Sequence, residues 1–190
     1  GCYQTAGPLG QDIAMATGMA IAERYMSATF NKPDFNVIDH FTFALCGDGD
    51  LQEGVTQEAM SLAGHLELGR LIVLYDSNDI QLDGPLKWAN SENVQEKYEA
   101  MGWHYIKVKN ANDLDELNDA ISIAKGVKNK PSIIEVKSVI GFGSSKAGDS
   151  ATHGAPLGKE EADAMRKSMN YDYGEFEVPE EVFEDFRENT

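Results

Sequence analysis

Short apolar blocks alternate along this chain with longer stretches in which apolar residues recur at helical spacing. Four blocks have the length and the flanking turn residues of strands, which predicts strands over 42–46, 71–75, 104–108 and 132–136. The other stretches predict helices over 9–29, 52–67, 93–101 and 114–127. This alternation predicts an α/β fold, in which a parallel sheet is flanked by helices.

The apolar pattern also predicts which surfaces are buried. The strands over 42–46 and 71–75 are apolar almost throughout, so both are expected to be buried. The helix over 9–29 carries apolar residues on several faces and is expected to be largely buried. The helix over 114–127, which Asn112 is expected to cap, has as its predicted core residues Leu114, Leu117, Ile121 and Ala124.

Oxygen-bearing residues follow the first two strands at the point where each strand ends. Asp48 comes after the first strand and Asn78 after the second. Parallel strands end at the same edge of a sheet, so these residues are expected to lie together. A carboxylate oxygen of Asp48, an amide oxygen of Asn78 and the backbone carbonyl of Ile80 suit Mg²⁺, which takes hard oxygen ligands and shares them with substrate phosphates. Gly49 leaves room for the backbone to approach a diphosphate.

This segment has two other interpretations, an ordinary turn and a calcium-binding loop. Gly-Asp-Gly-Asp after a strand also fits an ordinary turn, because Asp and Gly are common turn residues. A calcium loop of the EF-hand type needs Gly at its sixth place and Glu at its twelfth. Counted from Asp48, those places hold Glu53 and Ala59, so the calcium loop fails and the turn stays open.

Five segments resemble the transketolase family in their order along the chain and in their residue sequence. They span residues 5–11, 47–54, 75–84, 130–137 and 153–158. The Gly-Asp-Gly and Asn elements are shared by thiamine-diphosphate enzymes. Gly-Pro-Leu-Gly and His-Gly-Ala-Pro-Leu-Gly are typical of transketolase and its close relatives. The resemblance implies a thiamine-diphosphate-binding fold, and it favours the magnesium site over the simple turn.

The resemblance also implies ligands for the cofactor. Mg²⁺, which Ca²⁺ or Mn²⁺ can replace, would be held by Asp48, Asn78 and Ile80. The residues that would contact thiamine diphosphate are Gly7, Pro8, Leu9, Gly49, Asn78 and His153.

His153 and Glu53 carry further implied roles. His153 would contact the diphosphate region and the substrate and would assist proton transfer, which makes it the implied catalytic residue. Many relatives carry a second histidine three places earlier, where this chain has Ser150. A two-histidine arrangement therefore cannot be assumed. Glu53 would lie at a dimer interface near the cofactor.

The activity implied by the resemblance is transfer of a two-carbon glycolaldehyde unit from a ketose phosphate to an aldose phosphate, in the pentose phosphate pathway, by a homodimer. At 190 residues the chain is short for such an enzyme. We expect residues 1–190 to form a single domain, the diphosphate-binding domain truncated at its amino end. The pyrimidine-binding and carboxyl-terminal domains are expected to be absent, and the isolated chain inactive.

Two alternatives to a transketolase stay open at this point. One is a relative that resembles dihydroxyacetone synthase and differs in its acceptor. The other is a non-catalytic module that binds the cofactor, or a subunit of an enzyme split over two chains.

Charge and composition limit the partners. The net charge of −16 argues against nucleic acid, whose phosphates must be neutralised by Lys and Arg. No apolar run approaches the ~18 residues of a membrane span, so no membrane partner is expected. Cys2 and Cys46 make no disulfide framework, which favours a cytoplasmic location.

Overall fold

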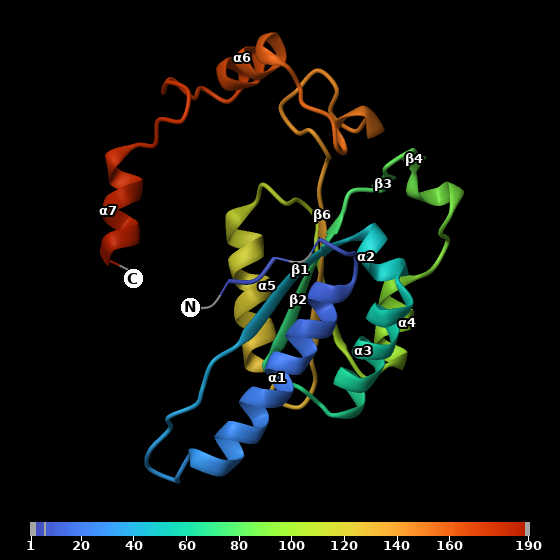
Figure 1. Cartoon of the computed structure of the whole chain (residues 1–190), viewed down its shortest axis with the longest axis vertical. Coiled ribbons are helices and arrows are strands. Elements are labelled where there is room, and N and C mark those ends of the chain that lie inside the picture. Colours follow the sequence, from blue (N-terminus) through green and yellow to red (C-terminus); the bar gives the residue numbers. More distant parts are fainter. Residues whose placement is uncertain (1–2, 6, 189–190) are drawn as a thin grey trace.

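The computed structural model describes residues 3–5 and 7–188, and its centre is a four-stranded sheet (Figure 1). The strands lie in the order β1-β2-β6-β5, and every neighbouring pair is parallel. Their bounds are β1 Thr42–Gly47, β2 Leu71–Ser77, β6 Ser132–Lys137 and β5 His104–Val108. The predicted α/β fold with a parallel sheet is confirmed, and so are the four strands. The sequence predicts no disulfide framework for Cys2 and Cys46. Cys2 lies outside the described residues, and Cys46 is a buried free cysteine.

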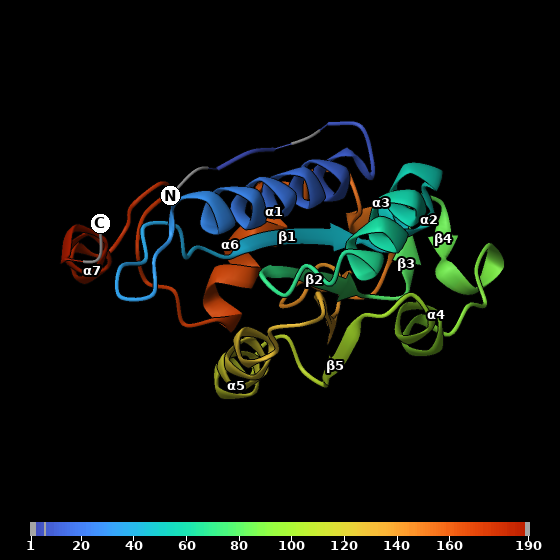
Figure 2. The same ribbon diagram turned by 90° about the horizontal axis from the view of Figure 1, so that it is seen from below.

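Helices cover both faces of this sheet (Figure 2). One face packs against α1 Gln11–Phe30, α3 Gly54–His65 and α4 Val94–Ala100, and the other packs against α5 Leu114–Gly126. The first core is built around the fully buried residues Ile13, Met60, Val73, Trp103 and Ile133. The second is smaller and contains Ile72, Val108, Ala120, Ala124, Ile134 and Val136. Two separate cores confirm that the sheet lies between helix layers.

The helix α1 is only half buried, so the expectation of a largely buried helix is wrong. Ile13, Ala16 and Ala20 face the core, but Met19 is 40% exposed and Tyr25 is 71% exposed. The reason is geometric: α1 packs against β1, β2 and α3 on one side only. A helix with apolar residues on all sides cannot bury the far side against a single layer.

The strand β1 lies at an edge of the sheet, and it is buried on one face only, so the expectation of a buried strand is wrong for its other face. Its residues alternate between buried and exposed, with Phe43 at 47% and Leu45 at 72% exposure. α1 covers the face that holds Ala44 and Cys46, whereas α5 packs against β5 and β6 at the far edge. The second face of β1 therefore has no helix over it among the described residues.

The start of α5 also differs from the prediction. The helix is capped by Asp113, whose carboxylate accepts a hydrogen bond from the Glu116 N–H at 3.0 Å, and not by Asn112. Leu114 is 75% exposed because it lies in the first turn, beyond the reach of the sheet. Ala124 is buried as predicted, and Leu117 and Ile121 pack against the same core while partly exposed.

Short elements cluster at the carboxyl edge of the sheet. The helix predicted over 52–67 is α3 Gly54–His65, and a further short helix that was not predicted, α2 Asp48–Gln52, precedes it, with Glu53 between the two. A small antiparallel hairpin, β3 Ile80–Gln81 and β4 Gly84–Pro85, follows β2 and leads into the short η1 helix Leu86–Trp88. These elements surround the ends of β1 and β2, so they define the site described below.

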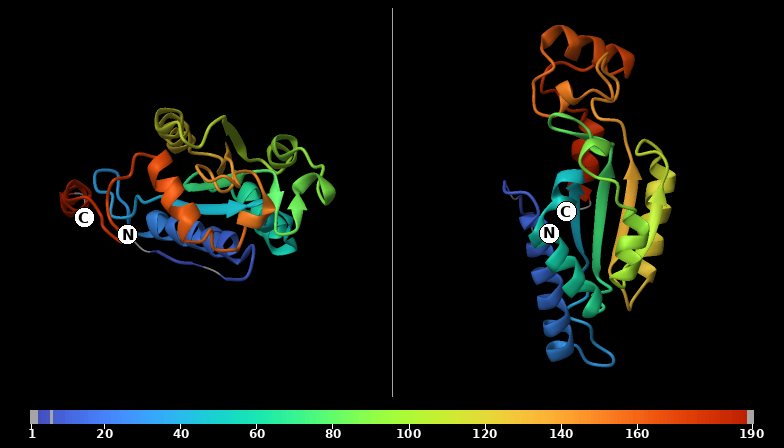
Figure 3. Two further views of the ribbon diagram at one scale, coloured as in Figure 1. Left: turned by 90° about the horizontal axis from the view of Figure 1, so that it is seen from above. Right: turned by 90° about the vertical axis from the view of Figure 1, so that its right-hand side faces the viewer.

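The last third of the chain leaves the layers after β6. It forms a loop with the short η2 helix Ser150–Thr152, then α6 Lys159–Ser168 and α7 Glu180–Glu188. Figure 3 shows η2 and α6 beyond the carboxyl edge of the sheet, and Figure 1 shows α7 to one side. Within the described ranges, no helix is long and apolar enough to cross a membrane.

Candidate magnesium and diphosphate site

The candidate site lies at the carboxyl edge of the sheet, where β1 passes directly into α2. Gly47 ends β1 and Asp48 begins α2, so this carboxylate sits where a parallel sheet presents groups to ligands. On the neighbouring strand β2, Asn78 comes directly after Ser77. α2 contacts both β2 and β3. The helix that begins with Asp48 therefore lies against the strand that begins with Ile80.

The buried Asp48 carboxylate has one satisfied oxygen and one spare oxygen. Oδ1 accepts a hydrogen bond from the Tyr75 hydroxyl, whereas Oδ2 is buried and has no partner in the described part of the chain. Burial raises the pKa of Asp48, and the charges of Asp79 and Asp76 raise it further, against the opposing effects of the Tyr75 hydrogen bond and the Lys137 charge. A buried carboxylate oxygen without a partner costs free energy. Oδ2 is therefore suited to a bound cation.

The amide of Asn78 has a defined orientation. Its Nδ2 donates to Asp76 Oδ2 at 3.2 Å, and its Oδ1 accepts from the Ile80 N–H at 2.9 Å. Between them, Asp79 adopts a left-handed conformation with φ of 64°. We call Asn78, Asp79 and Ile80 the 78–80 turn. Because both amide atoms have partners that fit only one assignment, Oδ1 is the atom that faces the Ile80 backbone.

The carbonyl of Ile80 points away from the hairpin. Ile80 pairs with Pro85, and the adjacent hydrogen bond runs from the Leu86 N–H to the Asp79 carbonyl at 2.8 Å. In an antiparallel ladder this pattern makes Ile80 and Pro85 a pair without mutual hydrogen bonds, so their carbonyls face outward. The Ile80 N–H, which faces the same way, bonds to Asn78. The Ile80 carbonyl thus emerges on the side of the Asn78 amide.

The predicted ligands are one carboxylate, one amide and one backbone carbonyl oxygen, which is fewer than the six that Mg²⁺ takes. Within residues 3–5 and 7–188, no three His, Cys, Asp or Glu side chains group so as to hold a metal. Mg²⁺ does not need such a cage, because it usually takes one or two carboxylates and completes its octahedron with phosphate oxygens and water. One carboxylate, one amide and one carbonyl therefore fit Mg²⁺ that is shared with a diphosphate.

A second acid, Asp50, ties the Gly-Pro-Leu-Gly loop to this edge, and sequence reasoning missed it. Its Oδ1 accepts from the Gly10 N–H and its Oδ2 from the Gly47 N–H, each at 2.9 Å. A side chain at Gly49 would place its Cβ 3.2 Å from Leu9 Cδ1. Residues 40 positions apart are thus held together. The only sequence signal for this contact is that the Gly-Asp-Gly-Asp segment contains a second Asp.

The loop before α1 presents an open backbone. Gly7, Pro8 and Leu9 are exposed, whereas Gly10 is buried with φ of 76°. A Cβ at Gly10 would lie 2.5 Å from Thr56 Oγ1, so only glycine fits there. The loop ends at the amino terminus of a 20-residue helix, where free N–H groups and the helix dipole favour anions. Its position beside Gly49 fits a diphosphate.

His153 and Glu53 do not join the cluster. His153 is exposed and lies directly after η2, beyond the carboxyl edge of the sheet. Across the described residues, no hydrogen bond links its imidazole to Asp48 or Asn78. Glu53 is exposed at the break between α2 and α3, and Ser150 begins η2. Glu53 lies beside the Gly7–Gly10 loop, since a Cβ at Gly10 would be 2.9 Å from the Glu53 Cβ, but in the described part of the chain no hydrogen bond joins the Glu53 side chain to Asp48 or Asn78.

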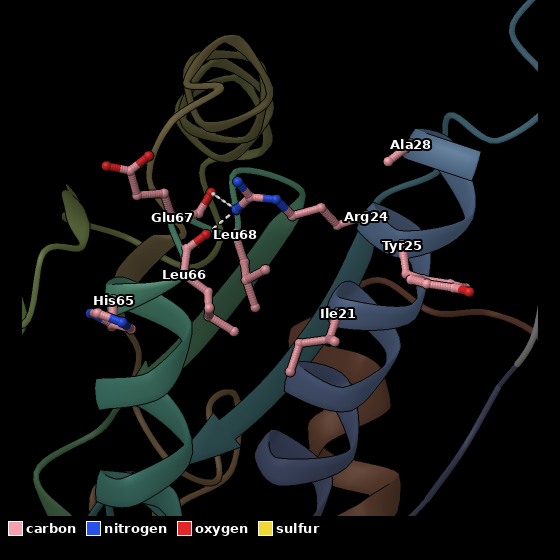
Figure 4. Close-up of a pocket in the computed structure, with 8 residues that line it drawn as sticks. All are labelled: Ile21, Arg24, Tyr25, Ala28, His65, Leu66, Glu67 and Leu68. Carbon is pink, nitrogen blue, oxygen red and sulfur yellow. Dashed lines mark hydrogen bonds between the residues drawn. The ribbon is translucent and has the colours of Figure 1, made fainter. Parts of the chain in front are cut away.

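A cavity of about 490 Å³ lies elsewhere, near the start of β2 (Figure 4). Its walls come from the second half of α1 and the end of α3, and they are mainly apolar. The one cation in this wall, Arg24, donates to the carbonyls of Leu66 and Glu67, which it caps at the end of α3. None of the candidate site residues lines this cavity, so it is separate from the candidate magnesium site.

Comparison with known proteins identifies the family. The family described as transketolase, thiamine diphosphate binding domain, matches residues 1–190. The transketolase of Streptococcus pyogenes serotype M6 is 57% identical over 186 residues, which cover 98% of this chain and 26% of that protein. The transketolase of Bacillus subtilis is 56% identical, with 98% and 28% covered.

A solved structure, the transketolase from Leishmania mexicana, superposes with a TM-score of 0.94 at 49% identity, over 96% of this chain and 28% of that chain. This chain thus spans little more than a quarter of the length of the relatives it matches. The resemblance drawn from the five sequence segments is confirmed: the chain belongs to the transketolase family and corresponds to its thiamine diphosphate binding domain.

Proposed function

We propose that this chain is the diphosphate-binding part of a transketolase that moves a two-carbon glycolaldehyde unit from a ketose phosphate to an aldose phosphate. The observation that carries the proposal is the buried Asp48 carboxylate, whose Oδ2 has no partner among the described residues and lies at the edge that holds the 78–80 turn. A spare buried carboxylate oxygen is costly. A cation at this place accounts for it.

The metal ligands in this proposal are Asp48 Oδ2, Asn78 Oδ1 and the Ile80 carbonyl, with Mg²⁺ as the ion and Ca²⁺ or Mn²⁺ able to replace it. The exposed backbone of Gly7, Pro8 and Leu9, together with Gly49 and Asn78, holds the diphosphate. Thiamine diphosphate, when bound, supplies the carbon–carbon bond chemistry. The chain itself supplies position and charge at the diphosphate end.

His153 serves the substrate and the cofactor in this proposal. An imidazole can accept and return a proton near neutral pH, which suits it to a sugar hydroxyl at the reacting centre. Its loop lies beyond the sheet edge, on the side where the site opens (Figure 3). Ser150 holds the place at which many relatives have a second histidine, so a pair of histidines from this loop is not part of the proposal.

The substrates and the remaining parts of the enzyme are also proposed. Transketolase from Pichia stipitis has been solved with sedoheptulose-7-phosphate and with xylulose-5-phosphate, which supports sugar phosphates as substrates. The net charge of −16 would repel such anions, so the cations that bind them are assigned to parts outside residues 1–190. The pyrimidine-binding and carboxyl-terminal domains belong there too.

Dimerisation and location complete the proposal. We assign the exposed Glu53 to the interface of a homodimer formed by the full-length protein, in the cytoplasm. Residues 1–190 are taken as one domain. The isolated chain is expected to show no ketol transfer, and turnover by the pure chain would contradict this.

Calorimetric titration tests the site directly. The unmodified chain is titrated with thiamine diphosphate in the presence and absence of Mg²⁺, beside Asp48→Asn and Asn78→Ala. Asp83→Asn is a matched control, since Asp83 is an exposed acid at the tip of the β3–β4 hairpin. We expect Mg²⁺-dependent binding that Asp48→Asn and Asn78→Ala abolish and Asp83→Asn preserves. Binding that survives Asp48→Asn, or absence of binding to the folded chain, would overturn the proposal.

A further inference from the structure

The orientation of the Asn78 amide is fixed by Asp76 and Ser138, two residues outside the proposed ligand set. Asp76 Oδ2 accepts from Asn78 Nδ2 at 3.2 Å, and Asp76 Oδ1 accepts a hydrogen bond from the Ser138 hydroxyl. Both carboxylate oxygens of Asp76 are therefore engaged. Ser138 follows the last residue of β6, and its own N–H donates to the Ser77 carbonyl at 3.3 Å. The amide plane of Asn78 is thus connected to the end of a strand inside the sheet.

A second connection runs from the same strand end to Asp79. Lys137 Nζ donates to Asp79 Oδ2 at 2.8 Å and to Ser77 Oγ at 3.1 Å. Ser77 in turn donates to Glu135 at 3.2 Å, and Glu135, which is 9% exposed, also accepts from the Tyr105 hydroxyl at 2.6 Å. The ammonium group that reaches Asp79 is therefore attached to a buried polar network and does not hang free in solvent.

The turn needs such support for a physical reason. A hydrogen bond from the Ile80 N–H to Asn78 Oδ1 is a local turn that asparagine forms by itself. That bond leaves the rest of the amide free to tilt, and the left-handed backbone of Asp79 is unfavourable for a residue with a side chain. β6 has a strand on each side and is therefore rigid. Contacts to it restrict the tilt of the Asn78 amide and hold the Asp79 backbone in its left-handed conformation.

We propose that Ser138 and Lys137 are positioning residues for the metal: Ser138 sets the Asn78 amide through Asp76, and Lys137 sets the backbone before the Ile80 carbonyl through Asp79. The inference rests on the proposed function, because it assigns these two residues to the same site. Residues behind a metal ligand commonly change metal affinity by about 10–100-fold when removed. Neither residue would touch the metal or the diphosphate.

The serine test uses substitutions that change no charge. Ser138→Ala removes the hydroxyl, Ser138→Thr retains it, and Ser132→Ala is the matched control. Ser132 lies at the other end of β6, is 1% exposed and has its hydroxyl 3.2 Å from His104 Nδ1. We expect Ser138→Ala to weaken Mg²⁺ binding at saturating thiamine diphosphate by about 10-fold. Ser138→Thr and Ser132→Ala should bind Mg²⁺ as the unmodified chain does.

The lysine test pairs Lys137→Met with Lys107→Met. Both lysines contact the same polar network, since Lys107 Nζ lies 3.2 Å from Glu135 Oε1, but only Lys137 reaches the 78–80 turn. The two variants change the charge equally. We expect weaker Mg²⁺ binding only in Lys137→Met.

Hydrogen exchange of the ligand-free chain supplies a readout that does not depend on binding. The Ile80 amide bonds to Asn78 and the Leu86 amide bonds to Asp79, so both report on the turn. We expect Ser138→Ala to speed exchange at Ile80 and Lys137→Met to speed it at Leu86, with no change in either control. Unchanged exchange, or unchanged Mg²⁺ affinity in both variants, would overturn the inference. If exchange is faster in the variants but the unmodified chain does not bind Mg²⁺ with thiamine diphosphate, both the proposed function and the role of these residues at the metal are overturned.

Discussion

Replacing Asp48 by Asn should stabilise the ligand-free chain while abolishing the proposed metal site. Asp48 is 6% exposed and Oδ2 has no partner within the described ranges, so the folded state holds a carboxylate that burial disfavours. Asparagine has the same shape, and its Oδ1 can still accept from Tyr75. An unsatisfied neutral group costs about 1–3 kcal/mol and a charged one more. We therefore expect a gain of about 1 kcal/mol, or about 2–4 °C for a chain of this size.

Asp50→Asn is the matched control, because it makes the same chemical change two residues away. Each Asp50 oxygen accepts one backbone hydrogen bond, from Gly10 and from Gly47. An asparagine can accept only one of them and turns its NH₂ group toward the other N–H. Hydrogen bonds to charged groups are worth about 1.5–3 kcal/mol, so this variant should lose stability by that amount. The two substitutions are thus expected to act in opposite directions.

Thermal unfolding followed by circular dichroism measures both effects. The pKa of Asp48 is raised above its ordinary value of 3.8, so the cost of its charge is fully present at neutral pH. The advantage of Asp48→Asn should fade as pH falls through that raised pKa toward 3.8. Mg²⁺ with thiamine diphosphate should raise the midpoint of the unmodified chain but not that of Asp48→Asn. An Asp48→Asn variant as unstable as Asp50→Asn would refute the reasoning, since the Asp48 carboxylate would then stabilise the fold.

Three further predictions concern local structure. Gly10→Ala should cost about 1–3 kcal/mol in urea unfolding, because φ is 76° and the new Cβ would lie 2.5 Å from a Thr56 oxygen; full stability would contradict the crowding. Asp113→Ala should cost about 1 kcal/mol and Asn112→Ala less than about 0.5, since only Asp113 caps α5; equal losses would reject that assignment. Burial lowers the pKa of His104 below 6.5, with help from Lys130. The chain should therefore lose stability relative to His104→Gln as pH falls through 6.5, and a pH-independent difference would disprove it.

The strands and the sheet type could be predicted because they depend on local patterns. Apolar blocks of strand length identified the four strands of the parallel sheet but not the short hairpin strands β3 and β4, and alternation with helices identified the sheet as parallel. Burial could not be predicted in the same way. Leu45 belongs to an apolar block and is 72% exposed, because β1 is an edge strand and α5 covers only the far half of the sheet. Position within the sheet is a property of the whole chain, and periodicity does not report it.

The helix start at Asp113 illustrates a different limit. Asn112 and Asp113 are adjacent residues that both make good caps. The choice depends on where the backbone leaves the extended conformation, and Asp113 has φ of −91° and ψ of 95° while Leu114 begins the helix. No difference in residue type separates the two positions. The prediction was therefore wrong by one residue for a reason that composition cannot reveal.

The ligand set of the candidate site was accessible from sequence, whereas its supports were not. Asp48 and Asn78 could be selected because each follows a strand in the same sheet. The Ser138 contact to Asp76 joins residues 62 positions apart, and the Lys137 contact to Asp79 joins residues 58 apart. Serine and lysine are common surface residues with no pattern of their own. Such supports become visible only when β6 is known to pair with β2.

Asp48 and Asp50 lie on the same short helix but have different roles: Asp50 holds two loops together, and Asp48 is a proposed metal ligand. Both acids lie in the first turn of α2, but residues two apart on a helix face different sides. Asp50 turns back to the N–H groups of Gly10 and Gly47 and uses both its oxygens there. Asp48 turns toward β2, where Tyr75 satisfies only one oxygen. Because Asp50 already holds the loops in place, the fold does not need the second oxygen of Asp48. That oxygen is therefore available to a cation, and its burial at the sheet edge is the cost that binding would relieve.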